Sequence, residues 1–325
     1  MSKPLLCAII GAGSIGGLID TPKNSNIASH AHAITLHEKC LLQAICEPDK
    51  TNQEEFKKRW GNISTYENSE DLFDKESIDL LAIASPTKWH ANNLHQALQA
   101  DSVSHILCEK PLVLTFEELE ILKPKLLQGE RKILINLMRR YDPSFIKIAN
   151  DVAMKRWGKA LHFQGVFTKG LLHNGIHMLG VLSHFFGEIE EINRLDVKLK
   201  DGDLSGDFTV KLKDASGLLS CISDAPYSVF ELTIWFENGK VVIKDGGAKI
   251  EIFVKKPSPL YEGYYILEHE ETVPDTLKFY ALNSLNFLIE SDTLSCKTIL
   301  KEHILLHEKI FQTIIKEDKD EKISN

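Results

Sequence analysis

The sequence lacks several features that would place a protein in a specialised class. It has no apolar run near the ~20 residues that a membrane-spanning helix needs, so we expect no membrane association. Its six cysteines are scattered without a Cys-x-x-Cys pair, which favours a reducing cytoplasm. Lys and Arg total 38 against 46 Asp and Glu, and the formal net charge is -8. This balance argues against a nucleic-acid partner, because phosphate binding needs clustered positive charge.

The length and composition are those of an ordinary globular protein. Hydrophobic residues make up 43% and charged residues 26% of the sequence, so neither disorder nor a fibre is expected. At 325 residues the chain is longer than a single compact core usually grows. Two domains of unequal size are the first expectation.

A glycine motif follows the first apolar run, in "LLCAIIGAGSIGG". Gly11, Gly13 and Gly16 have G-x-G-x-x-G spacing, and Ser14 and Ile15 fill the positions between them. The first glycine permits a tight turn, the second lets backbone N–H groups approach a pyrophosphate, and the third lets helix and strand pack closely. A plain glycine-rich turn is the alternative, but the position directly after a predicted strand favours a dinucleotide site at a helix N-terminus.

A carboxylate ends the second predicted strand, "CLLQAICE". Glu47 can accept both ribose hydroxyls of an adenosine, and its charge repels a 2′-phosphate, so NAD is predicted over NADP. Its distance from the glycines exceeds the usual ~20 residues, which we attribute to an inserted loop at "DTPKNSNIAS". A solvated acid at a strand end is the alternative interpretation.

Two further strand–loop–helix segments follow, "SIDLLAIASPTKWHANNLHQAL" and "SHILCEKPLVLTFEEL". Strands that alternate with helices predict crossover units and a parallel sheet, whose ligands bind beyond the carboxyl ends of the strands. Lys110 can donate a hydrogen bond to a substrate hydroxyl, although a surface pair with Glu109 is an equal alternative. The residues expected to line the cofactor cleft are Ser85, Pro86, Thr87, His90, Glu109, Lys110 and Pro111.

The pattern changes after "RKILINLMRRYDPSF", a predicted strand that leads into a helix near Pro143. Segments such as "FELTIWFENGKVVI" alternate or are rich in β-branched and aromatic residues, with "ENGK" and "DGG" as turns. They predict a mostly antiparallel sheet, followed by two helices within 275–316. This predicted sheet has apolar residues on both of its faces, and the helices of the domain can cover only one of them. We therefore expect another copy of the chain to cover the other face, in a homodimer or homotetramer.

Two histidines, His173 and His177, stand four residues apart in "LLHNGIHMLG". They could be metal ligands, satisfied polar groups of the core, or proton carriers. No acidic or thiol partner lies nearby in the sequence, so the prediction is that no metal is bound.

At this point the motifs resemble the glucose-fructose oxidoreductase, inositol dehydrogenase and MocA family (Gfo/Idh/MocA). The likeness covers nearly the whole chain and rests on "GAGSIG", the acid after strand two, "SPTKWH", "EKP", "RRYDP" and "NGIH", in this order. It implies an α/β protein with an N-terminal Rossmann doubly wound parallel sheet in residues 1–125. An α/β domain with an open, mostly antiparallel sheet would follow in residues 126–325, for substrate binding and oligomerisation.

The resemblance also implies roles for individual residues. Lys110 matches the family's lysine and His177 its histidine, and both act on a substrate hydroxyl. His173 takes the place of an aspartate and would orient its neighbour or relay a proton, and Gly180 takes the place of an acid that often follows. A histidine's ordinary pKa of about 6.5 suits proton exchange at neutral pH. Asn174, Arg140 and Tyr141 are candidates for substrate contacts, with a structural salt bridge as the alternative for the arginine.

Together these features predict an NAD(H)-dependent oxidoreductase acting on a secondary hydroxyl or ketone of a sugar, cyclitol or nucleotide sugar. A nucleotide sugar is preferred, because the lengthened first loop and "KGLLHNGIH" look similar to family members from surface-polysaccharide pathways. The alternative is a non-catalytic dinucleotide-binding regulator or scaffold of the same fold, because a fold does not fix a function.

Overall fold

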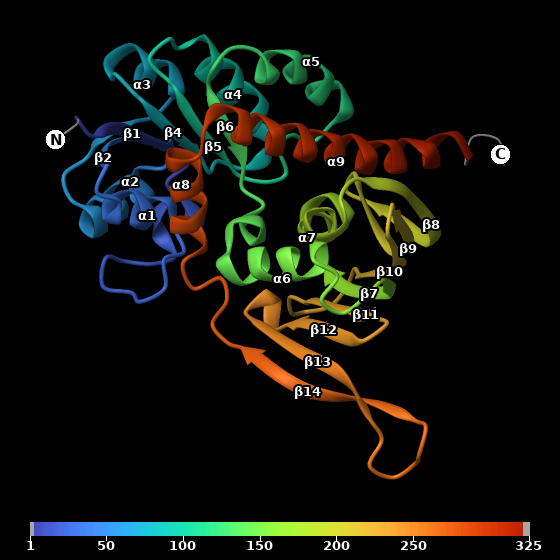
Figure 1. Ribbon diagram of the computed structural model, residues 1–325. Coiled ribbons are helices and arrows are strands. Elements are labelled where there is room, and N and C mark those ends of the chain that lie inside the picture. Colours follow the sequence, from blue (N-terminus) through green and yellow to red (C-terminus); the bar gives the residue numbers. More distant parts are fainter. Residues whose placement is uncertain (1–2, 321–325) are drawn as a thin grey trace. The chain divides into compact units, whose positions relative to one another are not determined.

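A parallel sheet of six strands lies at the centre of the first of two units in this computed structural model, which describes residues 3–320 (Figure 1). The strand order is β3-β2-β1-β4-β5-β6, which is the order of a doubly wound dinucleotide-binding sheet. The strands are β1 (Leu5–Ile10), β2 (Cys40–Cys46), β3 (Ser64–Tyr66), β4 (Leu80–Ile83), β5 (His105–Cys108) and β6 (Lys132–Ile135).

Helical segments connect these strands. The inserted loop predicted at residues 20–29 separates the short turn η1 from α1, so the first crossover is interrupted as expected. The segments are η1 (Ser14–Leu18), α1 (His30–Leu36), α2 (Lys50–Trp60), α3 (Ser69–Lys75), η2 (Thr87–Trp89), α4 (His90–Gln99), α5 (Phe116–Leu127), η3 (Met138–Tyr141), α8 (Tyr280–Glu290) and the start of α9 (Thr293–Asp320).

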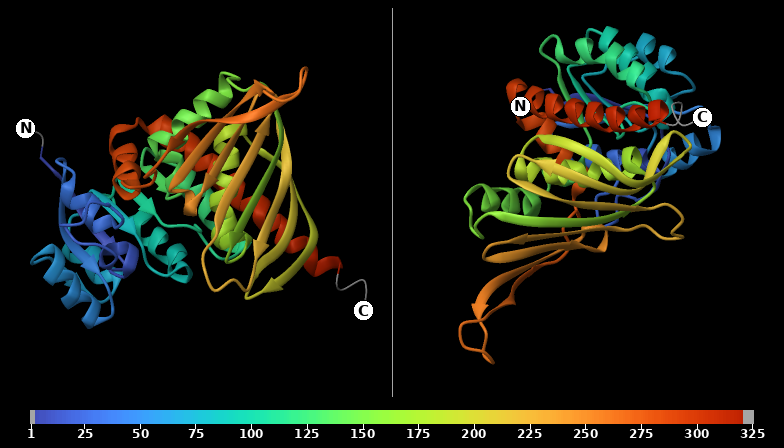
Figure 2. Two further views of the ribbon diagram at one scale, coloured as in Figure 1. Left: turned by 90° about the horizontal axis from the view of Figure 1, so that it is seen from below. Right: turned by 90° about the vertical axis from the view of Figure 1, so that its right-hand side faces the viewer.

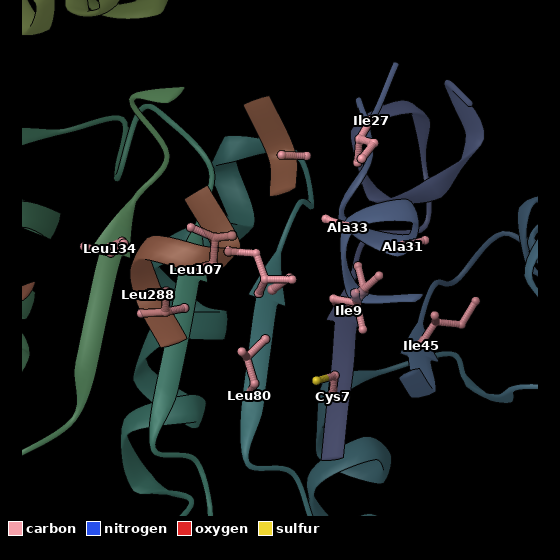
Figure 3. Close-up of a cluster of buried hydrophobic side chains, with 14 of the residues drawn as sticks. Cys7, Ile9, Ile27, Ala31, Ala33, Ile45, Leu80, Leu107, Leu134 and Leu288 are labelled. Carbon is pink, nitrogen blue, oxygen red and sulfur yellow. The ribbon is translucent and has the colours of Figure 1, made fainter. Parts of the chain in front are cut away.

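The core of this unit is a cluster of buried apolar side chains (Figure 3). Ile9, Leu80, Leu107 and Leu134 come from four neighbouring strands, and each is at most 1% exposed. Leu288 of α8 joins the same cluster. Burial of these side chains fixes the face of the sheet that carries them, and hence the register of each strand end.

The second unit contains a sheet of eight strands in the order β14-β13-β12-β11-β7-β10-β9-β8. Every pairing is antiparallel except that of β7 with β10, so the prediction of a mostly antiparallel sheet is confirmed. Its strands are β7 (Ala160–Thr168), β8 (Ile189–Lys200), β9 (Asp203–Leu212), β10 (Ala215–Ile222), β11 (Phe230–Phe236), β12 (Gly239–Lys244), β13 (Lys249–Pro257) and β14 (Tyr265–Val273).

Helices cover one face of this sheet (Figure 2). On β7, Phe163 and Phe167 are fully buried, and Gly165 between them lies against Met178 of α7. The side chains that alternate with them on β7 point to the other face, which we call the open face. The helical segments of this unit are α6 (Pro143–Ala153), η4 (Leu171–Gly175), α7 (Ile176–Phe186), η5 (Asp245–Gly247) and the later part of α9.

The division between the units differs from the predicted boundary at residue 125. The first unit comprises the chain up to Tyr141 together with Lys278–Ile304, and the second comprises Asp142–Leu277 and the residues from Leu305. Two contacts explain the difference. Strand β6 pairs with β5 in the parallel sheet, and α8 places Leu285 and Leu288 in the core of the first unit. Apolar periodicity predicts such a helix but not the sheet against which it packs.

None of the helices in the described part of the chain is long and apolar enough to cross a membrane.

Candidate active site

The predicted glycine loop lies at the carboxyl end of β1, and each glycine meets a different constraint. Gly11 has a φ of +93°, and a Cβ atom there would overlap the backbone of Ser85. A Cβ atom on Gly16 would overlap the carbonyl oxygen of Gly11, so the helix packs directly on the strand. Gly13 has no protein atom within 4 Å of its Cβ position. The loop is therefore packed against protein at its first and third glycines. At its second glycine it leaves space beside the backbone, as a pyrophosphate would require.

In the turn η1 that follows, the first backbone N–H groups to donate hydrogen bonds within the turn are those of Gly17 and Leu18. The N–H groups of Gly17 and Leu18 both donate to the carbonyl oxygen of Gly13, at 3.0 Å each. The N–H groups that precede them are those that a helix N-terminus offers to an outside acceptor. Gly13 and Ile15 are partly exposed and Ser14 is exposed, so this backbone is accessible. The residues present fit the phosphates of a dinucleotide.

Glu47 lies beside this loop, at the end of β2. Its Oε2 accepts the N–H of Ala12 at 2.8 Å, and its Oε1 accepts the N–H of Asp49 at 3.0 Å. The side chain is 7% exposed, so it is not the solvated strand-end acid of the alternative interpretation. A carboxylate oxygen can accept more than one hydrogen bond, so Glu47 can hold the loop and still accept a ribose hydroxyl.

His90 joins the two loops that follow β4 and β5. Its Nδ1 lies 2.9 Å from the carbonyl oxygen of Pro111, and its Nε2 lies 2.9 Å from that of Ser85. The ring is 1% exposed. A neutral imidazole donates to one of these oxygens, and the protonated ring donates to both. His90 thus links the two loops through its side chain. In the first of these loops, Pro86 is exposed and Thr87 is partly exposed.

Glu109 and Lys110 follow β5, and the Lys110–Pro111 peptide bond is cis. The Glu109 carboxylate accepts a hydrogen bond from His30 Nε2 at 2.9 Å and another from Asn136 Nδ2 at 2.6 Å. Burial alone would raise the pKa of Glu109, but these hydrogen bonds and the nearby charges of His30 and Lys110 lower it overall. Glu109 is therefore ionised at neutral pH, and its partners include His30 as well as the charge of Lys110.

The contact with His30 depends on the inserted loop. Asp20 accepts the N–H groups of Ala28 and Ser29 at 2.8 and 3.1 Å, and its carboxylate also meets the ring of His32 at 3.0 Å. These bonds order the insertion and set α1 so that His30 reaches Glu109. This role of the insertion was not predicted, and its one signal in the sequence is the "HAH" that follows the loop.

Arg140 and Tyr141, both predicted as substrate residues, have structural partners in the first unit. Arg140 forms an ion pair with Glu302 at 2.7 Å, which is the alternative that the sequence left open. Tyr141 is 4% exposed, and its ring lies 5.0 Å from that of Phe287. Tyr141 is thus a core residue, and its side chain does not support the predicted contact with substrate.

The two histidines belong to the second unit, on the connection from β7 to α7. His173 lies in η4 and is exposed, while His177 lies in the first turn of α7 and is partly exposed, as is Asn174. The neighbouring Leu171, Leu172 and Ile176 are buried. The segment therefore presents its polar side chains to the surface. Within residues 3–320, no group of three or more His, Cys, Asp or Glu side chains is arranged to hold a metal ion.

Comparison with known proteins places these features in a class. Residues 5–136 match the model of the Gfo/Idh/MocA family, described as an oxidoreductase family with an NAD-binding Rossmann fold. The chain is 29% identical over 168 residues to the inositol 2-dehydrogenase of Corynebacterium glutamicum (strain R), covering 51% of this chain and 46% of that protein. It is 26% identical over 117 residues to the D-glucoside 3-dehydrogenase of Escherichia coli (strain K12), covering 36% and 30%.

Solved structures extend the likeness to the whole fold. A 3-ketoreductase from Actinomadura kijaniata, in complex with NADP, matches with a TM-score of 0.73 and 14% identity, over 97% of each chain. The class defined by the fold and the glycine loop is thus that of Rossmann proteins with a dinucleotide-binding loop. The predicted resemblance to the Gfo/Idh/MocA family is confirmed for residues 5–136, which match that family's model. The matched part spans about half the length of the inositol dehydrogenase.

Single methyl groups on the glycine loop test this assignment. We expect Gly13→Ala to keep its fold, because its Cβ would meet no protein atom, but to bind NAD at least ~10-fold more weakly if a pyrophosphate packs there. Gly16→Ala is the matched contrast and should lose about 1–3 kcal/mol of unfolding free energy through the clash with Gly11. Calorimetry and chemical denaturation measure the two effects. Wild-type NAD affinity in Gly13→Ala would show that the phosphates lie elsewhere.

Proposed function

We propose that this protein is an NAD(H)-dependent oxidoreductase that transfers a hydride to or from a secondary hydroxyl or ketone. The observation that carries the proposal is the glycine loop, which is open at Gly13 and adjoins the buried carboxylate of Glu47. The nicotinamide, when bound, would supply the hydride chemistry. The protein's own part is to hold the cofactor and to handle the proton and charge on the substrate oxygen.

The substrate class we propose is a sugar, cyclitol or nucleotide sugar. Two relatives are named as dehydrogenases of inositol and of D-glucosides, and a structural neighbour is named a 3-ketoreductase, and these names support a substrate of this class. Among these substrates we favour a nucleotide sugar of the kind used for surface polysaccharides, on the similarity of "KGLLHNGIH" to such family members. The polar group His173, Asn174 and His177 suits a substrate with several hydroxyls.

For the chemical step we propose for Lys110 and His177 the roles that the family resemblance implies, in which each acts on a substrate hydroxyl. The Lys110 ammonium donates a hydrogen bond to the oxygen and stabilises the negative charge that develops when the hydroxyl is oxidised. His177 accepts the proton during oxidation and returns it during reduction, since a histidine exchanges protons near neutral pH. Glu109, held by His30 and Asn136, fixes the backbone that carries Lys110.

Turnover tests the proposal directly. Purified protein with NAD and myo-inositol, methyl glucosides or nucleotide sugars should produce NADH absorbance with at least one of them. With that substrate, Lys110→Ala and His177→Ala should each lower kcat by about 10²–10⁴-fold while NAD affinity stays near wild type. His269→Ala, an exposed histidine on β14, is the matched control. NAD binding without turnover on the whole panel would favour the regulator or scaffold instead.

For the cofactor we propose NAD over NADP. Glu47 would meet a 2′-phosphate with a buried negative charge, which costs binding energy that the hydroxyls of NAD do not cost. The expected result from calorimetry is tighter NAD than NADP for the wild type and a smaller difference for Glu47→Gln. Glu54→Gln, an exposed carboxylate on α2, should leave both affinities unchanged. Tighter binding of NADP by the wild type would remove Glu47 from the ribose site.

We propose a homodimer or homotetramer joined through the open face of the eight-stranded sheet. Apolar side chains are partly exposed there, with Leu218 at 36% and Ile222 at 41%, and Trp235 and Val242 are half-buried beside them. A second copy would remove this surface from water. Light scattering should report an assembly that Trp235→Glu weakens and that Leu294→Glu, on an exposed site of α9, does not. A monomeric wild type at micromolar concentration would contradict this.

For location we propose the cytoplasm. All six cysteines are free thiols in the structure, and five of them are buried residues of the apolar core. A protein with free thiols and a nicotinamide cofactor is suited to a reducing compartment. Cell fractionation with an antibody would test this, and recovery outside the cytoplasm would overturn it.

A further inference from the structure

The connection from β7 to α7 carries the polar group His173, Asn174 and His177, and its backbone is unusual. Lys169 and Gly170 both have positive φ angles, of 70° and 84°, immediately before the η4 turn. Left-handed backbone at a non-glycine residue costs free energy unless its surroundings hold it. The turn itself is a π-type turn, a form that recurs at functional sites. Something outside the connection must therefore fix its shape.

Asp203, the first residue of β9, makes the contacts that fix it. Its Oδ1 accepts the N–H of Leu172 at 2.8 Å, and its Oδ2 accepts the N–H of His173 at 3.0 Å. Its Oδ1 also accepts the N–H of Leu204, at 2.8 Å, which ties the carboxylate to its own strand. A Cβ atom on Gly170 would overlap this carboxylate, so the two groups are in direct contact. One charged group thus joins β9 to the start of the turn.

Asp203 is also an acid that the segment itself does not provide. Residues 171–180 contain no Asp or Glu, and Asp203 comes from about thirty residues further along the chain. Burial raises the pKa of its carboxyl, and the three backbone N–H groups and the charge of His173 oppose that rise.

We propose that Asp203 is a positioning residue for the substrate group His173, Asn174 and His177. Its carboxylate holds the η4 turn in one conformation by accepting the N–H groups of Leu172 and His173, so that His177 begins α7 in a fixed orientation. This inference rests on the proposed function only in that these side chains are taken to handle the substrate. It adds a residue outside the motif on which catalysis would depend.

Asp203→Asn is the informative substitution, because the amide keeps one carbonyl oxygen as an acceptor but loses the charge and the second acceptor. Asp207→Asn, at an exposed position on the same strand, is the matched control. Histidine-ring NMR spectra should show shifted resonances of His173 and His177 in Asp203→Asn but not in Asp207→Asn. The kcat for a substrate found with NAD should fall about 10- to 100-fold, while calorimetric NAD affinity stays unchanged.

Unchanged ring resonances of His173 and His177 in a folded Asp203→Asn protein would overturn the proposal and leave Asp203 a loop anchor only. If that variant does not fold, the wild type provides the test. The amide signals of Leu172, His173 and Leu204 and the ring signals of both histidines should then shift together as the Asp203 carboxyl titrates. Ring signals that do not follow it would equally overturn the proposal. Because NMR needs no turnover, absence of activity would count against the proposed function alone.

Discussion

Parallel pairing of the six strands is the constraint on which the candidate site depends. Parallel strands all end at one edge of the sheet, so the loops after β1, β2, β4, β5 and β6 meet there although they are far apart in the sequence. The register is set by buried side chains such as Ile9 and Leu107, which are at most 1% exposed. The glycine loop, Glu47, Ser85 and Glu109 are therefore brought together by the same forces that bury the core.

Carboxylates hold the connecting loops at both predicted sites. Glu47 fixes the glycine loop, Asp20 orders the insertion, and Asp203 fixes the turn that carries the histidines. In each case a buried or partly buried carboxylate accepts backbone N–H groups that the loop would otherwise leave unsatisfied. Such bonds to a charged acceptor are stronger than neutral ones, and they are local, so they can fix a loop without regular secondary structure.

The contact between His30 and Glu109 shows how an insertion can affect a site whose residues lie far from it in the sequence. The loop at residues 20–29 lengthens the first crossover, and its ordering by Asp20 brings His30 to the strand end that carries Lys110. Asn136 and Ser284 continue the hydrogen-bonded chain to β6 and α8, with Ser284 donating to Asn136 at 2.8 Å. The setting of Glu109 is thus assembled from four separate parts of the first unit.

Local pattern was sufficient for the parallel first sheet with its glycine loop, for the mostly antiparallel second sheet and for the family resemblance, because spacing and alternation reflect backbone geometry within a few residues. Tertiary packing alone decided five other features. It packs α8 into the core of the first unit, buries Tyr141 in that core and pairs Arg140 with Glu302. It also brought His30 to Glu109 and Asp203 to His173. These pairs are distant in sequence and polar, so no periodicity marks them. Only the folded arrangement of the strands determines which carboxylate meets which donor.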